Sequence, residues 1–262
     1  MNELSSVEIS EQIYRLENMK VGVMTNPRTP LCIILDLSGS MELYKDQIKS
    51  IVRQTVNHLK AVGKRYFTLI IIGIYRDRSR VLYFGELRDF DAEAFIGTLP
   101  LMCRGHSPLV SAFRKADTYL GEVMKACEVS KQICTIPFFF IVTDAKCTEN
   151  TERYTGILKT LSEDMAYNRK IIVECVTSDN EDGVDFGGYK ILMDQEDSEK
   201  TIINCMKALQ LASSTDVDAT NGPFDQVSRP PKNNRVAYGE YLSHILATNV
   251  LFYFNNLTGR DA

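Results

Sequence analysis

The sequence predicts an α/β fold: a doubly wound, mostly parallel central sheet with one antiparallel edge strand and helices on both faces. Continuous apolar runs too short for core helices are typical of strands buried on both faces. Five such runs span 31–36, 66–75, 81–85, 136–144 and 170–177. Helical patterns alternate with most of them, which favours parallel pairing through crossover helices.

The first half of the chain predicts one crossover and one hairpin. Apolar residues recur at three- and four-residue steps between 48 and 62, which indicates a helix with a single buried stripe between the first two strands. Only a few charged residues separate the runs at 66–75 and 81–85. Because so short a link cannot hold a crossover helix, we expect an antiparallel hairpin at the sheet edge.

The second half continues the alternation and then loses it. Helical patterns are expected at 109–124, 154–165 and 198–211, and a last helix at 238–254. The stretch between 212 and 235 is rich in Ser, Asp, Asn, Gly and Pro, which is typical of a loop or linker. The predicted organisation is an N-terminal extension at 1–29, one α/β domain at 30–211, a linker at 212–235 and a C-terminal helix packing on the domain at 236–262.

Composition excludes several classes of protein. With 44% hydrophobic and 24% charged residues, the 262-residue chain has no disorder signature, and a net charge of −4 argues against nucleic-acid binding. The N-terminus lacks the basic start and apolar run of a signal peptide, and the longest C-terminal apolar stretch is shorter than the ~20 residues of a membrane-spanning helix. Seven scattered cysteines without a CxxC motif indicate reduced thiols. We therefore expect a cytoplasmic protein without a membrane segment.

Oxygen-bearing side chains gather where predicted strands end. Asp36, Ser38 and Ser40 alternate in "ILDLSGSMELY" directly after the first run, and Asp144 closes the run "FFFIVTD". Ser107 lies in a turn before a predicted helix. Ligands of open α/β sheets bind beyond the carboxyl ends of the strands, where strand order reverses, so the fold itself would bring the two carboxylates together.

These residues resemble the metal-ion-dependent adhesion site of von Willebrand factor type A domains. That family has Asp-x-Ser-x-Ser after the first strand, a Thr in a later turn before a Pro-Leu helix start, and an Asp in a strand-ending TDG. The present chain is complete in the first element, has Ser107 in place of the Thr, and has Asp144 in "TDA", with Ala145 in place of the Gly. The resemblance covers roughly residues 30 to 210, and among branches of the family the chain is most similar to bacterial TerY-like proteins.

The resemblance implies a VWA-like or Rossmann-like fold and a non-enzymatic, protein-binding function. Its metal ligands would be Asp36, Ser38, Ser40, Ser107 and Asp144. It implies Mg²⁺, with Mn²⁺ as the alternative, and hard oxygen ligands suit these ions. An open coordination position would accept a carboxylate from a partner protein. Since TerY-like proteins are found near kinases, phosphatases or stress-resistance genes, an adaptor or scaffold role is expected. Oligomeric state is not indicated.

Other interpretations of the same residues stay open. The DLSGS stretch could be only a strand-to-helix turn, and a vestigial site would leave a structural interaction protein that binds through residues 212–262. Cys103, His106 and Cys147 could offer zinc ligands, although no fourth ligand is evident. A metal-dependent hydrolase is the weakest hypothesis, because a dehalogenase-type phosphatase needs an acid where Ser38 stands, and no nucleophile elbow or phosphate-binding loop is present.

One further acidic stretch invites a metal interpretation. The run at 179–185 alternates acids as a calcium loop does, but Lys190 stands where the closing Glu would be required, so a solvated loop is favoured.

Overall fold

The computed structural model describes residues 3–18, 28–61, 66–100, 102–132, 134 and 137–144, and the backbone of 171–177 and 189–193. Within this part, one sheet contains β1 (Arg28–Asp36), β2 (Tyr66–Tyr75), β3 (Arg78–Glu86), β4 (Phe138–Thr143), β5 (Ile171–Thr177) and β6 (Tyr189–Met193). The α-helices are α1 (Ser6–Glu17), α2 (Lys45–Ala61), α3 (Ala92–Thr98) and α4 (Leu109–Val129), and the short 3-10 helices are η2 (Gly39–Tyr44) and η3 (Leu87–Asp89).

The strand order is β3-β2-β1-β4-β5-β6, and every pairing is parallel except that of β2 with β3. The predicted doubly wound α/β fold with one antiparallel edge strand is thus confirmed. The predicted hairpin is also confirmed, with Arg76 and Asp77 at its tip in the left-handed region, at φ 52° and 61°. Two consecutive positive φ values match the twist of a tight hairpin turn.

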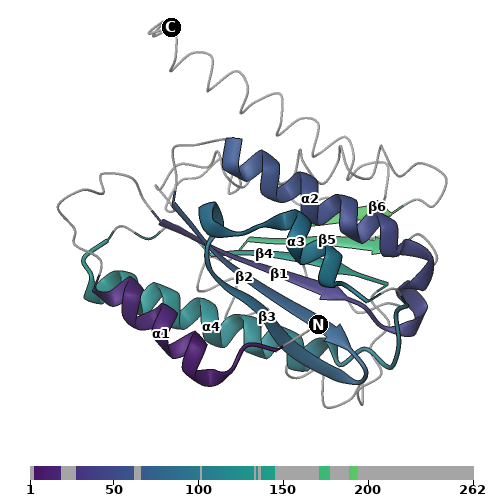
Figure 1. Ribbon diagram of the computed structural model, residues 1–262, viewed down its shortest axis with the longest axis horizontal. Coiled ribbons are helices and arrows are strands. Elements are labelled where there is room, and N and C mark those ends of the chain that lie inside the picture. Colours follow the sequence, from purple (N-terminus) through teal and green to yellow (C-terminus); the bar gives the residue numbers. More distant parts are fainter. Residues whose placement is uncertain are drawn as a thin grey trace, which may run out of the picture.

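Helices cover both faces of the sheet: α2 and α3 lie on one face, and α1 and α4 lie on the other (Figure 1). β1 is buried along its whole length. Its side chains alternate between the layers: Leu31, Ile33 and Leu35 face α2, while Cys32 and Ile34 face α4. Burial on both faces explains why this strand reads as an unbroken apolar run.

The N-terminal segment, expected as an extension, contributes α1 to the domain. Ser5 and Glu8 form a capping box, in which each side chain bonds the other residue's backbone N–H. Ile9 and Leu16 are buried against the α4 layer, and the Leu4 amide donates to the Val81 carbonyl at 2.8 Å. Apolar spacing along α1 therefore buries one face of the segment. β1 also begins at Arg28, two residues before the predicted domain boundary.

Among the described α-helices and strands, α1, α3 and β6 were not predicted, and neither were the short 3-10 helices η2 and η3. α3 has only seven residues and β6 only five, too few to show a period. The predicted helices at 154–165, 198–211 and 238–254, the linker at 212–235 and the acidic run at 179–185 lie outside the described residues. Among the helices that are described, none has the length and apolar character needed to cross a membrane.

Candidate metal centre

The candidate site lies where the order of strands reverses. From β1 the chain moves outward to β2 and β3, and only later returns to β4 on the other side of β1. Leu35 pairs with Val142, so Asp36 and Thr143 end neighbouring parallel strands. This point is the usual crevice for ligands in open α/β sheets.

Asp36 joins three segments of the chain. Its Oδ1 accepts a hydrogen bond from the Ser38 amide at 2.9 Å, and its Oδ2 accepts from the Ser107 hydroxyl at 2.6 Å and the Thr143 hydroxyl at 2.7 Å. Ser107 and Thr143 lie 71 and 107 residues away in sequence. The carboxylate is fully buried. It is therefore the centre of a polar cluster that only the tertiary structure assembles.

Burial makes the charge of Asp36 costly. Loss of hydration raises the pKa of the Asp36 carboxyl above its usual range, and the hydrogen bonds from Ser107, Ser38 and Thr143 offset only part of that rise. Within the described residues no cationic side chain pairs with it. Because buried charges in proteins are generally paired or coordinate metals, the Asp36 carboxylate is a candidate metal ligand.

The two serines of the first motif lie at different depths. Ser38 has extended backbone and is buried, whereas Ser40 is exposed within η2. Their hydroxyl oxygens are 3.3 Å apart. The 3-10 helix turns the chain immediately after β1, so alternate residues of the motif bring both hydroxyls to the same side. Ser40 therefore lies at the open side of the cluster.

The loop that carries Ser107 is tied to its neighbours through its backbone. The Arg104 amide donates to the Leu37 carbonyl at 3.1 Å, and the Arg76 amide donates to the Arg104 carbonyl at 3.0 Å. The Glu42 carboxylate accepts from the Cys103 amide, and the Asp77 carboxylate accepts from the His106 amide at 2.6 Å. These contacts hold the loop against β1 and the β2–β3 turn.

Gly105 is the residue that lets this loop approach so closely. Its φ is +86°, and a Cβ there would lie 2.7 Å from the Arg76 Cα and 2.8 Å from the Asp77 backbone nitrogen. Its carbonyl accepts from the Gly39 amide at 3.1 Å. Only glycine adopts this backbone freely without meeting the neighbouring turn. The placement of Ser107 therefore depends on Gly105.

The five predicted ligands fall into two groups. Asp36, Ser38, Ser40 and Ser107 form one hydrogen-bonded cluster. Asp144 is buried directly after Thr143 at the end of β4, at the same edge of the sheet. All five are thus at the carboxyl ends of β1 and β4 or in the loop tied to them, while Ala145 lies outside the described residues.

Sequence reasoning missed three residues that build the site. Thr143 bonds Asp36 directly, while Glu42 and Asp77 hold the Ser107 loop. A hydroxyl immediately before Asp144, in the strand paired with β1, was the available signal for Thr143. Nothing local marks Glu42 or Asp77, because each accepts its bond from a residue far along the chain.

The zinc alternative gains little from the geometry. Burial, and next the nearby Glu42 charge, raise the pKa of the Cys103 thiol to about 12, which disfavours the thiolate that zinc needs. His106 is exposed, and Cys147 lies outside the described residues. Within the described part of the chain, no three His, Cys, Asp or Glu side chains group as metal ligands.

Comparison of the sequence with models of known protein families and with curated proteins found no match. Among solved structures, the chain is similar to the pilus adhesin SpaC from Lactobacillus rhamnosus GG in an open conformation. The TM-score is 0.52 and the identity 12%, over 74% of this chain and 31% of the adhesin. The chain thus spans under a third of that protein, and at this identity the likeness shows a shared fold.

Two other solved structures give weaker matches. They are manganese-loaded TRAP protein from Plasmodium vivax, with TM-score 0.46 and 13% identity over 70% of this chain and 75% of that one, and the PilB minor pilin from Streptococcus sanguinis, with TM-score 0.47 and 12% identity over 72% and 62%.

Proposed function

We propose that the chain is a non-enzymatic binding module that uses a divalent cation to bind an acidic side chain of a partner protein. The ligands would be Asp36, Ser38, Ser40, Ser107 and Asp144, and the ion Mg²⁺ or Mn²⁺. The observation that carries the proposal is the Asp36 carboxylate, which is buried at the strand-order reversal among donated hydrogen bonds and without a cationic partner among the described residues.

The direction of the hydrogen bonds supports metal binding. A hydroxyl has one donor and two acceptor lone pairs. The Ser107 hydroxyl donates its proton to Asp36, so its lone pairs remain for another group. Ser38 and Ser40 add neutral oxygens beside it. Hard oxygens of this kind are the ligands that magnesium prefers.

The balance of charge supports a partner carboxylate as the bound group. Only two of the five predicted ligands carry negative charge, and three are neutral hydroxyls. When bound, the divalent cation would be formally balanced by the two carboxylates, and its three neutral hydroxyl ligands would leave it Lewis-acidic enough to accept a carboxylate oxygen. The exposed Ser40 places one side of the cluster toward solvent, where such a group can approach.

The cellular role is proposed by resemblance. TerY-like proteins suggest an adaptor or scaffold in a bacterial stress-resistance or signalling system. A cytoplasmic location is supported by the thiols of Cys32, Cys103 and Cys127, since reduced thiols are typical of a reducing compartment.

Calorimetric titration of Mg²⁺ tests the proposal on the whole chain. The wild type should bind one ion, Asp36→Asn should abolish binding, and Asp89→Asn should leave it unchanged, because Asp89 is an exposed acid outside the cluster. Binding that is lost equally in both variants, or undetectable in the wild type, would contradict the proposal and favour the vestigial-site interpretation.

A further inference from the structure

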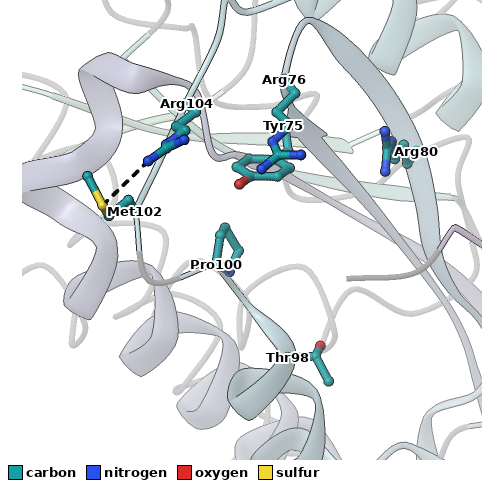
Figure 2. Close-up of a pocket in the computed structure, with 7 residues that line it drawn as sticks. All are labelled: Tyr75, Arg76, Arg80, Thr98, Pro100, Met102 and Arg104. Carbon is teal, nitrogen blue, oxygen red and sulfur yellow. Dashed lines mark hydrogen bonds between the residues drawn. The ribbon is translucent and has the colours of Figure 1, made fainter.

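A pocket of about 450 Å³ opens on the α3 side of the sheet, against the loop that leads to Ser107. It is lined by Tyr75, Arg76, Arg80, Thr98, Pro100, Met102 and Arg104 (Figure 2). Three of these side chains are guanidinium groups, and none of the lining residues is acidic. A concave surface with this composition is suited to an anion.

The three arginines are not neutralised by the described part of the protein. No ion pair joins Arg76, Arg80 or Arg104 to a described carboxylate. In addition, the Arg80 Nε is shielded from solvent and has no hydrogen-bond partner among the described residues. A buried donor left without an acceptor costs free energy, so an acceptor that enters the pocket gains from supplying one.

Neighbouring side chains hold two of the guanidinium groups without cancelling their charge. The Arg76 guanidinium carbon lies 5.1 Å from the centroid of the Tyr75 ring, a cation–π contact. The Arg104 Nη2 donates to the Met102 sulfur at 3.9 Å, a weak contact. Figure 2 shows the Arg76 guanidinium over the Tyr75 ring, with Arg104 on one side of them and Arg80 on the other. These contacts therefore fix the positions of the Arg76 and Arg104 guanidinium groups and leave their positive charge available to an anion in the pocket.

The pocket is continuous with the loop that carries the predicted ligand Ser107. Arg104 precedes Ser107 by three residues, and its amide bonds the Leu37 carbonyl next to Asp36. Its own carbonyl accepts from the Arg76 amide, so two of the arginines are linked through the backbone. A ligand that reaches the metal centre therefore has this positive pocket next to it.

We propose that the arginine pocket binds further carboxylates of the same acidic partner segment whose side chain engages the metal centre. This inference rests on the proposed function and specifies its partner as an acidic peptide segment, with several Asp or Glu residues close together. Guanidinium groups match carboxylates in geometry and can bind them with two parallel hydrogen bonds. The net charge of −4 favours a local peptide contact over a nucleic-acid backbone, which needs an extended basic surface.

The test uses the 262-residue chain and a fluorescein-labelled pentaglutamate peptide, with binding followed by anisotropy at low salt in Mg²⁺ and again in EDTA. The variants are Arg80→Gln, Arg104→Gln and the double variant. Arg114→Gln is the matched control, because Arg114 is exposed on α4, on the other face of the sheet. A labelled pentaglutamine peptide and a labelled oligothymidylate of similar length serve as comparison ligands.

Each pocket substitution should weaken pentaglutamate binding ~5-fold or more, both in Mg²⁺ and in EDTA, since charge-assisted hydrogen bonds are among the stronger polar contacts. The control should bind as the wild type does, and pentaglutamine should not bind. Circular dichroism should show that all variants remain folded.

Three results separate the hypotheses. Pocket variants that bind pentaglutamate as tightly as Arg114→Gln would overturn the pocket proposal, whatever the effect of EDTA. Oligothymidylate that binds more tightly than pentaglutamate and loses affinity in the same variants would overturn the choice of an acidic peptide. If EDTA has no effect while the pocket variants fail to bind, the pocket is supported and the metal-dependent function is contradicted.

Discussion

The two ends of β1 each carry a buried ionisable side chain, but the two side chains differ in whether the protein supplies an opposite charge. At the start of the strand, the fully buried Arg28 guanidinium forms an ion pair with Glu86 and donates to Gln132 at 2.8 Å and Thr68 at 2.7 Å. At the end, the fully buried Asp36 carboxylate receives only neutral donors from the described part of the chain.

The difference separates a charge that the protein pairs internally from one that the proposed function would use. A buried ion must be paired and hydrogen-bonded, or its desolvation destabilises the folded state. Arg28 meets that condition within the protein. Asp36 does not meet it with the described residues, so a bound cation would supply the counter-charge. The same strand thus carries a paired charge at one end and, among the described residues, a charge without a counter-ion at the other, where we propose that a cation binds.

Breaking the ion pair at the start of β1 should have the largest effect on the free energy of unfolding. Glu86→Gln leaves the buried Arg28 charge without its counter-charge, and we expect the free energy of unfolding to fall by ~3 kcal/mol. Glu93→Gln is the matched control, because its ion pair with Arg53 is exposed and screened by solvent, so its loss should change the free energy of unfolding little. Urea denaturation measures both. Equal losses in the two variants would show that burial does not distinguish these pairs.

The next largest effect should come from the loop that presents Ser107. Gly105→Ala combines a left-handed backbone with contact against Arg76 and Asp77, so we expect a loss of ~1–3 kcal/mol in unfolding free energy and weaker Mg²⁺ binding. Gly97→Ala has no atom near its added methyl group and lies inside α3, so it should be neutral or stabilising. Unchanged Mg²⁺ affinity in Gly105→Ala would show that the loop does not position the site.

Neutralising Asp36 should not destabilise the metal-free protein, whereas breaking the Arg28 ion pair should. Because burial raises the pKa of Asp36 in the folded state, the native protein holds this proton at pH values where the unfolded chain has lost it. Its contribution to stability is therefore present at low pH and is lost as the pH rises through the raised pKa.

It follows that, in EDTA at neutral pH, Asp36→Asn should be at least as stable as the wild type, and its stability should depend less on pH. Added Mg²⁺ should stabilise only the wild type. Thermal unfolding across pH, with and without Mg²⁺, measures this. A variant that is less stable than the wild type in EDTA at every pH would mean that the carboxylate's hydrogen bonds outweigh its buried charge.

The smallest expected change in the free energy of unfolding concerns the end of α4, close in sequence to Gln132, which bonds Arg28. Lys131 has φ 56° directly after the last turn of this helix, a conformation that glycine adopts without strain. Lys131→Gly should raise the unfolding free energy by ~0.5 kcal/mol or more and leave Mg²⁺ binding unchanged. A loss of stability would show that the Lys131 side chain contributes more than its backbone strain costs.

The sequence predicted more of the fold than of the contacts within the candidate site. The apolar runs located five of the six described strands, because burial on both faces leaves a continuous signal in the sequence. The strand β6 and the helix α3 were missed, since five to seven residues are too few to show a period. The helix α1 carried a usable signal, the Ser5 and Glu8 pattern of a capping box.

What the sequence determined by itself is local. Hydrophobic patterning set the strands and helices, and the residue types after β1 and at the end of β4 indicated an oxygen-ligand site. Only the tertiary structure decided that the Thr143 hydroxyl bonds Asp36, that Gly105 fits against the Arg76 turn, and that three arginines line one pocket. The physical reason is distance along the chain: patterning reports which face of an element is buried, whereas these contacts depend on sheet order and on loops that meet across about a hundred residues.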